Sequence, residues 1–559
     1  MRVDASGWVV GFDDDQARRL LAAGIWRGRT IFDDARDAAA ATPDRICLRD
    51  GTREISYRGI LLEAQALAAA LAAHGLRPGQ VVAFQLPNWI EAAVVNIAAA
   101  MLGLVVNPIV PIYRDKEVAE ILADCGAKVL FVPSVWRGFD HTAMAERVRA
   151  ATPQLELVIR VRAPDDALPT PRYENLLRYA PAGAPAPSCA QDANAVKLVM
   201  YTSGTTGRAK GVLHTHNTLA RALAGCMEYW RIGAGDPILM PSPVSHVTGY
   251  LWGLEAPFSW GTPAVLMDRW DAGNAVELID AQGIALTVGA TPFLSELLDA
   301  AAMRQTRLPS LRIFACGGAA VPPDLIRRAN HLFAGGRALR VYGATEVLMI
   351  GKGFIEDGTE ALAAETDGKI SGYELRFIDD AGRPVPDGTQ GEIIARGPAQ
   401  AVGYVDRDAT AASYDAQGFF HTGDLGLRTP EGAIVITGRK KDLIIRGGEN
   451  ISAKEIEDIL QRHPSVNESA VVAMPHLRLG ETVCACVIAR GAPPTLAALV
   501  AHLEQTGIAR QKLPERLELF DDFPRTAAGK VKKDILREIV ARHLQHEQAA
   551  QAAAHRETP

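Results

Sequence analysis

The chain has 559 residues, of which 48% are hydrophobic and 22% are charged, and its formal net charge is −6. This length predicts two or more domains, and the hydrophobic share is enough for large cores. The small negative charge argues against a general nucleic-acid binder and against a protein held on anionic membranes by charge.

The cysteines and the apolar stretches indicate a reducing, cytoplasmic compartment. Seven cysteines are scattered along the chain without a CxxC pair, so neither a disulfide framework nor a zinc site is predicted. The start of the sequence has no cationic stretch followed by an apolar one, so we expect no signal peptide. The most apolar stretch, residues 91–113, is interrupted by Asn96, Asn107 and Pro108, and we therefore expect a buried helix and strand there, not a membrane span.

Strand and helix patterns alternate in the N-terminal half. Three strands and two helices are expected in the order strand 81–86, helix 89–102, strand 104–109, helix 116–124 and strand 128–132. This alternation is typical of a parallel sheet covered by helices on both faces. The proline- and alanine-rich residues 179–190 predict a surface connection.

Further short strands follow in the middle of the chain. Residues 196–201 predict a strand, and a helix is expected to begin near Asn217. Residues 311–315 and 339–342 predict two more strands, each ending in a turn that contains glycine.

The C-terminal part has a different pattern. Short strands and turns dominate from Gly391 onward. The sequence SAKE at 452–455 predicts a capping box, and the helix it begins has an apolar stripe. Residues 471–473 and 483–488 predict strands of a small α+β unit. After Leu544 no core pattern remains, so we expect a mobile tail.

The segment YTSGTTGRAKGV, residues 201–212, has the composition of a phosphate-binding loop. Backbone N–H groups in a glycine-rich turn can converge on one anion, hydroxyl side chains add donors, and Lys210 supplies charge. The segment does not have the Walker order, which needs a serine or threonine directly after the lysine. For this stretch alone, a polar surface loop is the alternative.

This segment resembles the phosphate loop of the adenylate-forming superfamily, which includes acyl-CoA synthetases, adenylation domains of peptide synthetases and beetle luciferases. Four more motifs follow in the family's order: YGATE at 342–346, HTGD at 421–424, GRKKDLI at 438–444 and PRTAAGK at 524–530. The resemblance covers residues 31–537. One departure is Ala209, where the family usually has proline, and it removes no ligand group. The run AAGIWRGRTIFDD at 22–34 is similar to medium-chain and cyclohexanecarboxylate acyl-CoA ligases.

The resemblance implies an α/β fold in two domains. A large N-terminal domain, residues 1–440, would contain mostly parallel sheets layered with helices, plus a β-rich subdomain, and would bind ATP and the acyl group. A small mobile α+β domain, residues 441–544, would carry the catalytic lysine and the thiol-tunnel loop. Residues 545–559 are expected to be a disordered tail.

The implied reaction uses ATP, Mg²⁺ and coenzyme A. A carboxylate attacks the α-phosphate of ATP and expels pyrophosphate, which gives an acyl-adenylate. A thiol then attacks the acyl carbon and expels AMP. Because the first step brings one anion onto another, charge neutralisation and in-line positioning should dominate its catalysis.

The resemblance assigns most nucleotide contacts to three motifs. The phosphate cradle would comprise Thr202, Ser203, Gly204, Thr205, Thr206, Gly207 and Lys210. Glu346 would hold Mg²⁺, which prefers oxygen ligands, and Thr345 would donate to the α-phosphate. Adenine would lie between Tyr342, which precedes Gly343, and the turn formed by Gly318, Ala319 and Ala320. Without the family, Glu346 would be interpreted as a solvated residue at a helix start.

The remaining motifs supply the ribose contacts and the reacting groups. Asp424 would accept both ribose hydroxyls, and Arg439 would reinforce that contact. Lys530 would bridge the attacking carboxylate and the α-phosphate from a mobile loop. Lys441 falls at the hinge about which the small domain swings between the two steps, and Gly448 would line the pantetheine tunnel.

The acyl pocket is expected at residues 242–249, 315–320 and 344–349, with His246 between the acyl and thiol channels. Residues 242–249 contain no aspartate to pair with an amino acid's ammonium, and no phosphopantetheine-attachment sequence follows Lys530. Both observations favour a neutral hydrophobic acid and free CoA. Val341, where many long-chain relatives have glycine, favours a short, medium-chain or ring-shaped acid.

Three alternatives remain at this point: an acyl-AMP ligase that loads a carrier protein, a nucleotide-binding regulator without turnover, and a luciferase-like oxygenase. The expected partners are a small carboxylic acid and CoA. A nucleic-acid partner and an integral membrane segment are not expected, and a homodimer is left open. The run at 530–533 is basic, but it lacks the aromatic residues of a nucleic-acid site.

Overall fold

The structure is a computed structural model that describes residues 2–51, 53–166, 168–179, 192–202, 209–318, 321–446, 449–526 and 529–556. The chain divides into two compact units. The first unit contains Met1–Gly318, Leu325–Leu375 and Ala395–His421, and the second contains Ala319–Asp324, Arg376–Ile394 and Thr422–Pro559. The domain limits expected from the family, 1–440 and 441–544, remain predictions.

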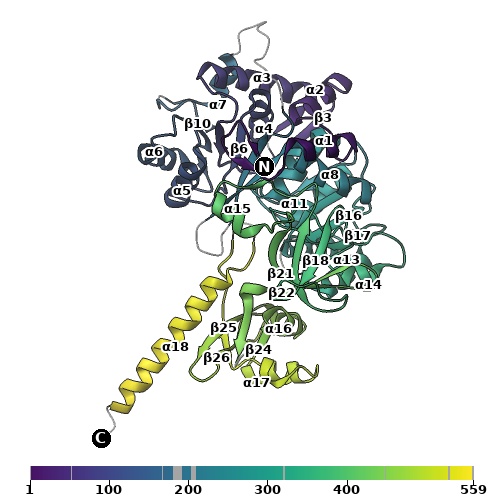
Figure 1. Cartoon of the computed structure of the whole chain (residues 1–559), viewed down its shortest axis with the longest axis vertical. Coiled ribbons are helices and arrows are strands. Elements are labelled where there is room, and N and C mark those ends of the chain that lie inside the picture. Colours follow the sequence, from purple (N-terminus) through teal and green to yellow (C-terminus); the bar gives the residue numbers. More distant parts are fainter. Residues whose placement is uncertain are drawn as a thin grey trace. The chain divides into compact units, whose positions relative to one another are not determined.

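The first unit has a seven-stranded sheet that carries the flanks of the predicted phosphate loop. Its strand order is β10 (Leu157–Val161), β7 (Val129–Pro133), β5 (Val81–Phe84), β6 (Val105–Pro108), β11 (Val196–Thr202), β12 (Lys210–Thr215) and β20 (Gly403–Tyr404). Figure 1 labels two of these strands, β10 and β6. The first five strands run parallel, and the last two are each antiparallel to the strand before. The predicted parallel sheet is therefore confirmed.

The helices of this part are amphipathic or buried as their sequences require. They include α3 (Tyr57–Ala73), α4 (Ile90–Leu102), α5 (Asp115–Cys125), α6 (His141–Ala151) and α8 (His216–Tyr229). Every residue of α4 is buried, and the carboxylate of Glu91 pairs with Arg53 at 3.1 Å and Arg162 at 2.9 Å. This confirms that residues 91–113 form a buried helix and strand. No described helix is long and apolar enough to cross a membrane.

A second seven-stranded sheet of the first unit is parallel except at one edge. Its order is β17 (Arg337–Val341), β16 (Ile313–Gly317), β15 (Leu286–Gly289), β13 (Ile238–Met240), β14 (Ala264–Leu266), β3 (Ile46–Asp50) and β4 (Arg53–Ser56), with β4 antiparallel. Its helices include α2 (Ile31–Ala41), α11 (Ala272–Gln282), α12 (Thr291–Met303) and α13 (Pro323–Leu332). Such sheets place residues at their carboxyl ends on one edge, where α/β proteins bind ligands.

Two smaller sheets follow. The four-stranded sheet has the order β18 (Glu374–Ile378), β19 (Gly391–Arg396), β21 (Phe420–Arg428) and β22 (Ile434–Arg439). The other sheet contains β24 (Glu449–Ser452), β23 (Leu443–Arg446), β26 (Gly480–Ala489), β25 (Val466–His476) and β27 (Arg516–Leu519), and α16 (Ala453–Leu460) and α17 (Leu496–Glu504) accompany it. This confirms the predicted small α+β unit.

The predicted capping box at the start of α16 is formed on one side. The Ser452 hydroxyl accepts a hydrogen bond from the Glu455 N–H at 3.4 Å. The Glu455 carboxylate instead binds the Lys512 ammonium at 2.7 Å, because a charged partner is within reach.

The last helix, α18 (Lys533–Arg556), differs from the expected irregular tail after Leu544. Alanine, glutamine and glutamate dominate this stretch, and they have high helix propensity even without a core pattern. Arg516 binds the Glu547 carboxylate at 2.7 Å and 2.8 Å, which anchors the helix beyond its last apolar contacts. The expected mobility of this segment remains untested.

Candidate active site

The two strands that flank the predicted phosphate loop form an antiparallel pair. Thr202 ends β11, Lys210 begins β12, and the two residues are opposite each other in the register. Ser203, Gly204, Thr205, Thr206 and Gly207 lie outside the described residues. Strand β12 is not among the elements that the sequence predicts, because lysine, histidine and threonine interrupt its apolar residues.

Lys210 and Glu346 both contact Tyr404, which the sequence analysis does not single out. The Lys210 Nζ lies 5.1 Å from the centroid of the Tyr404 ring, and the Tyr404 hydroxyl donates to Glu346 Oε1 at 2.9 Å. Burial and the neighbouring Glu346 carboxylate raise the pKa of Tyr404 well above its ordinary value, so the phenol remains a neutral donor. Lys210, the predicted phosphate ligand, and Glu346, the predicted metal ligand, thus both contact the same tyrosine.

Thr345 is fixed through its backbone by a buried histidine of β12. The His214 Nε2 donates to the Thr345 carbonyl at 2.7 Å, and its Nδ1 is 3.0 Å from the Thr218 hydroxyl. Burial lowers the pKa of His214 to about 4, so the ring is neutral at neutral pH. The only sequence signal for this role is the position of His214, four residues after Lys210.

The predicted adenine site has tight backbone packing. Tyr342 and Gly351 exchange two backbone hydrogen bonds, of 3.1 Å and 2.9 Å. A Cβ on Gly343 would lie 2.6 Å from the Met349 nitrogen, so only glycine fits there. Gly318 has a φ of +81°, which also favours glycine. Ala319 and Ala320 lie outside the described residues.

His246 begins a short helix, α9 (Val247–Gly249), beside the predicted acyl pocket. Its Nδ1 accepts a hydrogen bond from the Thr248 N–H at 3.3 Å, so the ring is held at the helix start. The next segment, Tyr250–Glu255, is a buried π-helix. Such helices are rare and often occur at functional sites.

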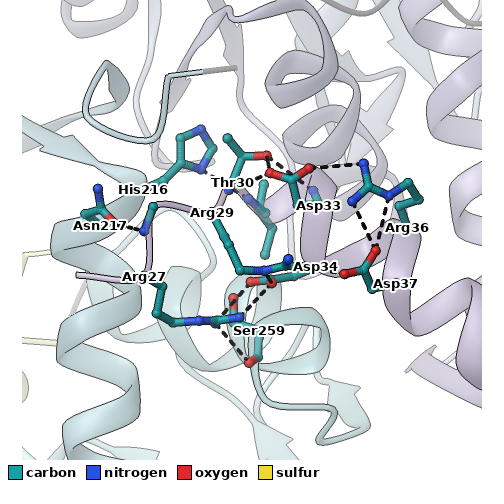
Figure 2. Close-up of polar contacts among 12 residues, drawn as sticks. Arg27, Arg29, Thr30, Asp33, Asp34, Arg36, Asp37, His216, Asn217 and Ser259 are labelled. Atoms are coloured by element: carbon teal, nitrogen blue, oxygen red, sulfur yellow. Dashed lines mark hydrogen bonds and ion pairs between the residues drawn. The ribbon is translucent and has the colours of Figure 1, made fainter. Parts of the chain in front are cut away.

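The N-terminal segment holds the start of α8, the helix that follows β12 (Figure 2). The Gly28 N–H donates to Asn217 Oδ1 at 3.0 Å, and the Ile31 N–H donates to His216 Nδ1 at 3.2 Å. Figure 2 also shows Arg27 and Arg29 converging on the Asp34 carboxylate, at 2.8 Å and 2.9 Å. Residues 22–34, which carry the resemblance to medium-chain ligases, thus bind the start of the helix that directly follows the strand bearing Lys210.

The second unit brings the predicted ribose residues together. Asp424 of β21 and Arg439 of β22 are opposite each other, and Arg439 Nε donates to Asp424 Oδ1 at 2.7 Å. The Asp424 side chain is 6% exposed and that of Arg439 46%, so the carboxylate is fixed and the guanidinium reaches solvent. The site offers acceptors for hydroxyl groups.

The residues assigned to the hinge and to the first chemical step also lie in the second unit. Lys441 is in the 3₁₀ helix Lys440–Asp442, and Arg537 donates to its carbonyl at 3.1 Å. The Lys530 N–H donates to the Thr526 hydroxyl at 3.1 Å, and the Thr526 N–H donates to the Lys530 carbonyl at 2.7 Å. These two bonds join Thr526 to Lys530, whereas Ala527 and Ala528 lie outside the described residues. Gly448 lies outside the described residues.

The described residues fit a magnesium ion carried by nucleotide phosphates. They contain no cluster of three or more histidine, cysteine, aspartate or glutamate side chains that could hold a metal ion alone. Magnesium in nucleotide enzymes is usually bound by one or two carboxylates together with phosphates and water. Glu346 would supply such a carboxylate, and both it and Lys210 contact Tyr404.

Comparisons with known proteins identify the family of this chain. The model of the AMP-binding enzyme family matches residues 35–405, and that of the AMP-binding enzyme C-terminal domain matches residues 455–530. A medium-chain fatty-acid–CoA ligase of Escherichia coli K12 is 33% identical over 539 residues, covering 95% of this chain and 94% of the relative. A 2,3-dihydroxybenzoate-AMP ligase of Bacillus subtilis 168 is 32% identical over 95% of this chain and 97% of the relative.

Solved structures show the same fold. The crystal structure of ATP-bound MatB from Rhodopseudomonas palustris matches with a TM-score of 0.81 and 27% identity, over 91% of this chain and 98% of that chain. The chain belongs to the AMP-binding enzyme family and is thus an adenylate-forming ligase. The predicted resemblance and the α/β fold class, with a large N-terminal and a small C-terminal domain, are confirmed.

Proposed function

We propose that this chain is an ATP- and Mg²⁺-dependent carboxylic acid–CoA ligase. Its carboxylic acid substrate forms a bond from a carboxylate oxygen to the α-phosphorus of ATP, and the bond from that phosphorus to pyrophosphate breaks. The CoA thiolate then bonds to the acyl carbon, the bond to the phosphate oxygen breaks, and AMP leaves. The observation that carries the proposal is the approach of Lys210 and Glu346 to one buried tyrosine in a chain that matches both family models.

The proposal gives each site residue a role, and the roles of the phosphate-loop hydroxyls and of Gly448 rest on the family resemblance, because these residues lie outside the described part of the chain. Lys210 would neutralise charge on the β- and γ-phosphates, and the hydroxyls of the phosphate loop would donate hydrogen bonds to them. Glu346 would hold the Mg²⁺, which would supply positive charge at the phosphate oxygens. Thr345, fixed by His214, donates to the α-phosphate. Asp424 binds the ribose hydroxyls with Arg439 beside it. Lys530 bridges the two anions of the first step, after which movement about Lys441 admits the thiol past Gly448.

The proposed acid is neutral and of short or medium chain length, or alicyclic. The absence of aspartate from residues 242–249 and the bulk of Val341 support this choice. The relative from Escherichia coli is a medium-chain fatty-acid–CoA ligase, which agrees with it.

A second candidate function is an acyl-AMP ligase that loads a carrier protein. The relative from Bacillus subtilis is a 2,3-dihydroxybenzoate-AMP ligase, and a 33% identical relative from Mycobacterium tuberculosis H37Rv is a salicyl-AMP ligase and salicyl-S-ArCP synthetase. The proposed acid–CoA ligase requires free CoA, whereas a carrier-protein ligase requires a phosphopantetheinylated protein.

The deciding experiment measures AMP formation from ATP and Mg²⁺ with and without CoA. The acids are butyrate, hexanoate, octanoate, palmitate, cyclohexanecarboxylate, benzoate and salicylate. We expect CoA-dependent AMP release with hexanoate or cyclohexanecarboxylate, and its loss in Lys530→Ala. The matched control is Lys532→Ala, two residues away on the same segment, which should retain activity.

Two other results would contradict the proposal. Acid-dependent exchange of pyrophosphate without CoA consumption, with benzoate or salicylate as the best acid, supports the carrier-protein ligase. ATP binding without AMP formation from any acid supports the nucleotide-binding regulator.

A further inference from the structure

Tyr404 is a buried residue that no motif of the sequence assigns to the reaction. It lies on β20, which pairs with β12, so that Tyr404 is opposite Val212 two residues beyond Lys210. Its side chain contacts the Lys210 ammonium through the ring face and the Glu346 carboxylate through the hydroxyl. One rigid side chain thus contacts the lysine through its ring and the glutamate through its hydroxyl.

We propose that Tyr404 is a positioning residue that holds the Lys210 ammonium and the Glu346 carboxylate apart and ready for nucleotide. This inference rests on the proposed function, because it takes Lys210 as a phosphate ligand and Glu346 as the Mg²⁺ ligand. None of the five motifs quoted from the sequence contains this tyrosine.

The physical reason is the attraction between the two opposite charges. In a partly buried site, a lysine and a glutamate close to each other form an ion pair, which ATP would have to break. Within the described part of the chain, the structure shows no ion pair that joins Lys210 to Glu346; Tyr404 contacts both of them instead. The ring face attracts the cation, and the hydroxyl forms a charge-assisted hydrogen bond to the carboxylate.

The backbone keeps this arrangement rigid. The Ala401 N–H donates to the Glu346 carbonyl at 2.7 Å, and the Tyr404 N–H donates to the Thr410 hydroxyl at 2.9 Å. The Tyr414 hydroxyl donates to the Ala401 carbonyl at 3.1 Å. Residues 401–404 are thus hydrogen-bonded both to the backbone of Glu346 and to the helix α15 (Arg407–Ser413), which holds the backbone of the tyrosine in place.

The test compares two variants by calorimetric ATP binding, with and without Mg²⁺ and without any acid. Tyr404→Phe keeps the ring and removes the hydroxyl, so we expect it to reduce the gain in affinity from Mg²⁺ by about tenfold and to leave Mg²⁺-free binding within about twofold. Tyr404→Leu removes both contacts, and we expect it to weaken Mg²⁺-free binding as well, by about tenfold. Tyr57→Phe, which removes a buried hydroxyl that donates to the Pro257 carbonyl in another part of the first unit, is the matched control and should change neither affinity.

A rescue variant separates positioning from a merely structural role. If the lysine and glutamate pair directly in Tyr404→Leu, adding Glu346→Gln should restore Mg²⁺-free ATP affinity, because a neutral amide does not capture the ammonium. A structural defect would not be rescued in this way.

Three outcomes would overturn the inference. In the first, Tyr404→Phe responds to Mg²⁺ as the parent chain does. In the second, Tyr404→Leu is not rescued by Glu346→Gln. In the third, the parent chain does not bind ATP with Mg²⁺, which overturns the proposed function too. Normal ATP binding without AMP formation from any acid would contradict the proposed function alone.

Discussion

At the scale of single residues, the buried His214, in its neutral form, holds the backbone of Thr345. Its Nε2–H donates to the Thr345 carbonyl, an arrangement that the neutral ring already satisfies. Protonation would place a charge in a fully buried position next to the predicted α-phosphate ligand. Burial therefore lowers the pKa of His214 to about 4.

This histidine should make the folded state less stable in acid. Its pKa is about 4 when folded and about 6.5 when unfolded, so below pH 6.5 the unfolded state binds the proton first and stability falls as pH is lowered toward 4. At pH 5 the loss is about 2 kcal/mol. His214→Gln keeps a hydrogen-bond donor for the Thr345 carbonyl. Between pH 7 and pH 5, its free energy of unfolding, measured with urea, should fall by about 2 kcal/mol less than that of the parent chain.

The control is His331→Gln, at an exposed position, which should leave the pH dependence unchanged. His216 is also buried, and its pKa is lowered by burial and by Lys197, so part of the acid sensitivity should persist in His214→Gln. An unchanged pH dependence in His214→Gln would contradict the neutral assignment.

At the scale of elements, the 3₁₀ helix Lys440–Asp442 is the candidate hinge. Lys440 binds the Glu392 carboxylate at 2.8 Å, and Arg537 binds both the Lys441 carbonyl and the Asp442 carboxylate. The helix lies inside the second compact unit, whose nearest limit is between His421 and Thr422. The proposed hinge and the limit of the unit are thus at different positions in the chain.

Lys441→Pro should separate the two chemical steps. Proline fixes φ near −65°, which restricts rotation at this residue without removing a carbonyl acceptor. In rapid-quench experiments we expect acyl-adenylate formation within about threefold of the parent chain and thioester formation slower by about tenfold or more. Lys441→Ala, which keeps backbone freedom, is the control. Thioester formation at the normal rate in Lys441→Pro would show that the hinge lies elsewhere.

Strand β12 and helix α18 show the limits of local patterns. Strand β12 forms because β11 and β20 supply its hydrogen-bond partners on both sides, although its sequence, KGVLHT, does not alternate. Helix α18 continues past Leu544 because its residues have high helix propensity and Glu547 finds Arg516. The partners β20 and Arg516 are remote in the sequence from the segments that they stabilise.

At the scale of the whole molecule, the buried cysteines indicate reduced and unreactive thiols. All six described cysteines are free and buried. Burial raises the pKa of Cys47, Cys125, Cys226 and Cys316 to about 12, so they are protonated at neutral pH. None of these thiols is therefore a nucleophile for the reaction.

The thiols should report on unfolding of the whole chain. In Cys189→Ser, which removes the seventh cysteine, we expect almost no reaction with an aromatic disulfide reagent at pH 8 until denaturant unfolds the protein, when six thiols react. Rapid reaction of one thiol under native conditions would identify a region that opens locally.

The sequence alone determined the family, the fold class and the order of most elements. Alternating apolar runs encode parallel strands and helices locally, and each motif contains its reactive residues within a few positions. For that reason Lys210, Glu346, Asp424, Arg439 and Lys530 could be assigned before any contact was known. The acyl specificity was not determined in this way, because a pocket combines segments such as 242–249 and 344–349.

Only the tertiary structure decided which residues support the reacting groups. Tyr404 reaches Glu346 across 58 positions of sequence, and His214 reaches Thr345 across 131. No local periodicity records such contacts, since a single tyrosine or histidine has the same sequence signal in a core and beside a phosphate site. Their roles arise from pairing β12 with β20 and from burial, which fixes the phenol and the imidazole in their neutral forms.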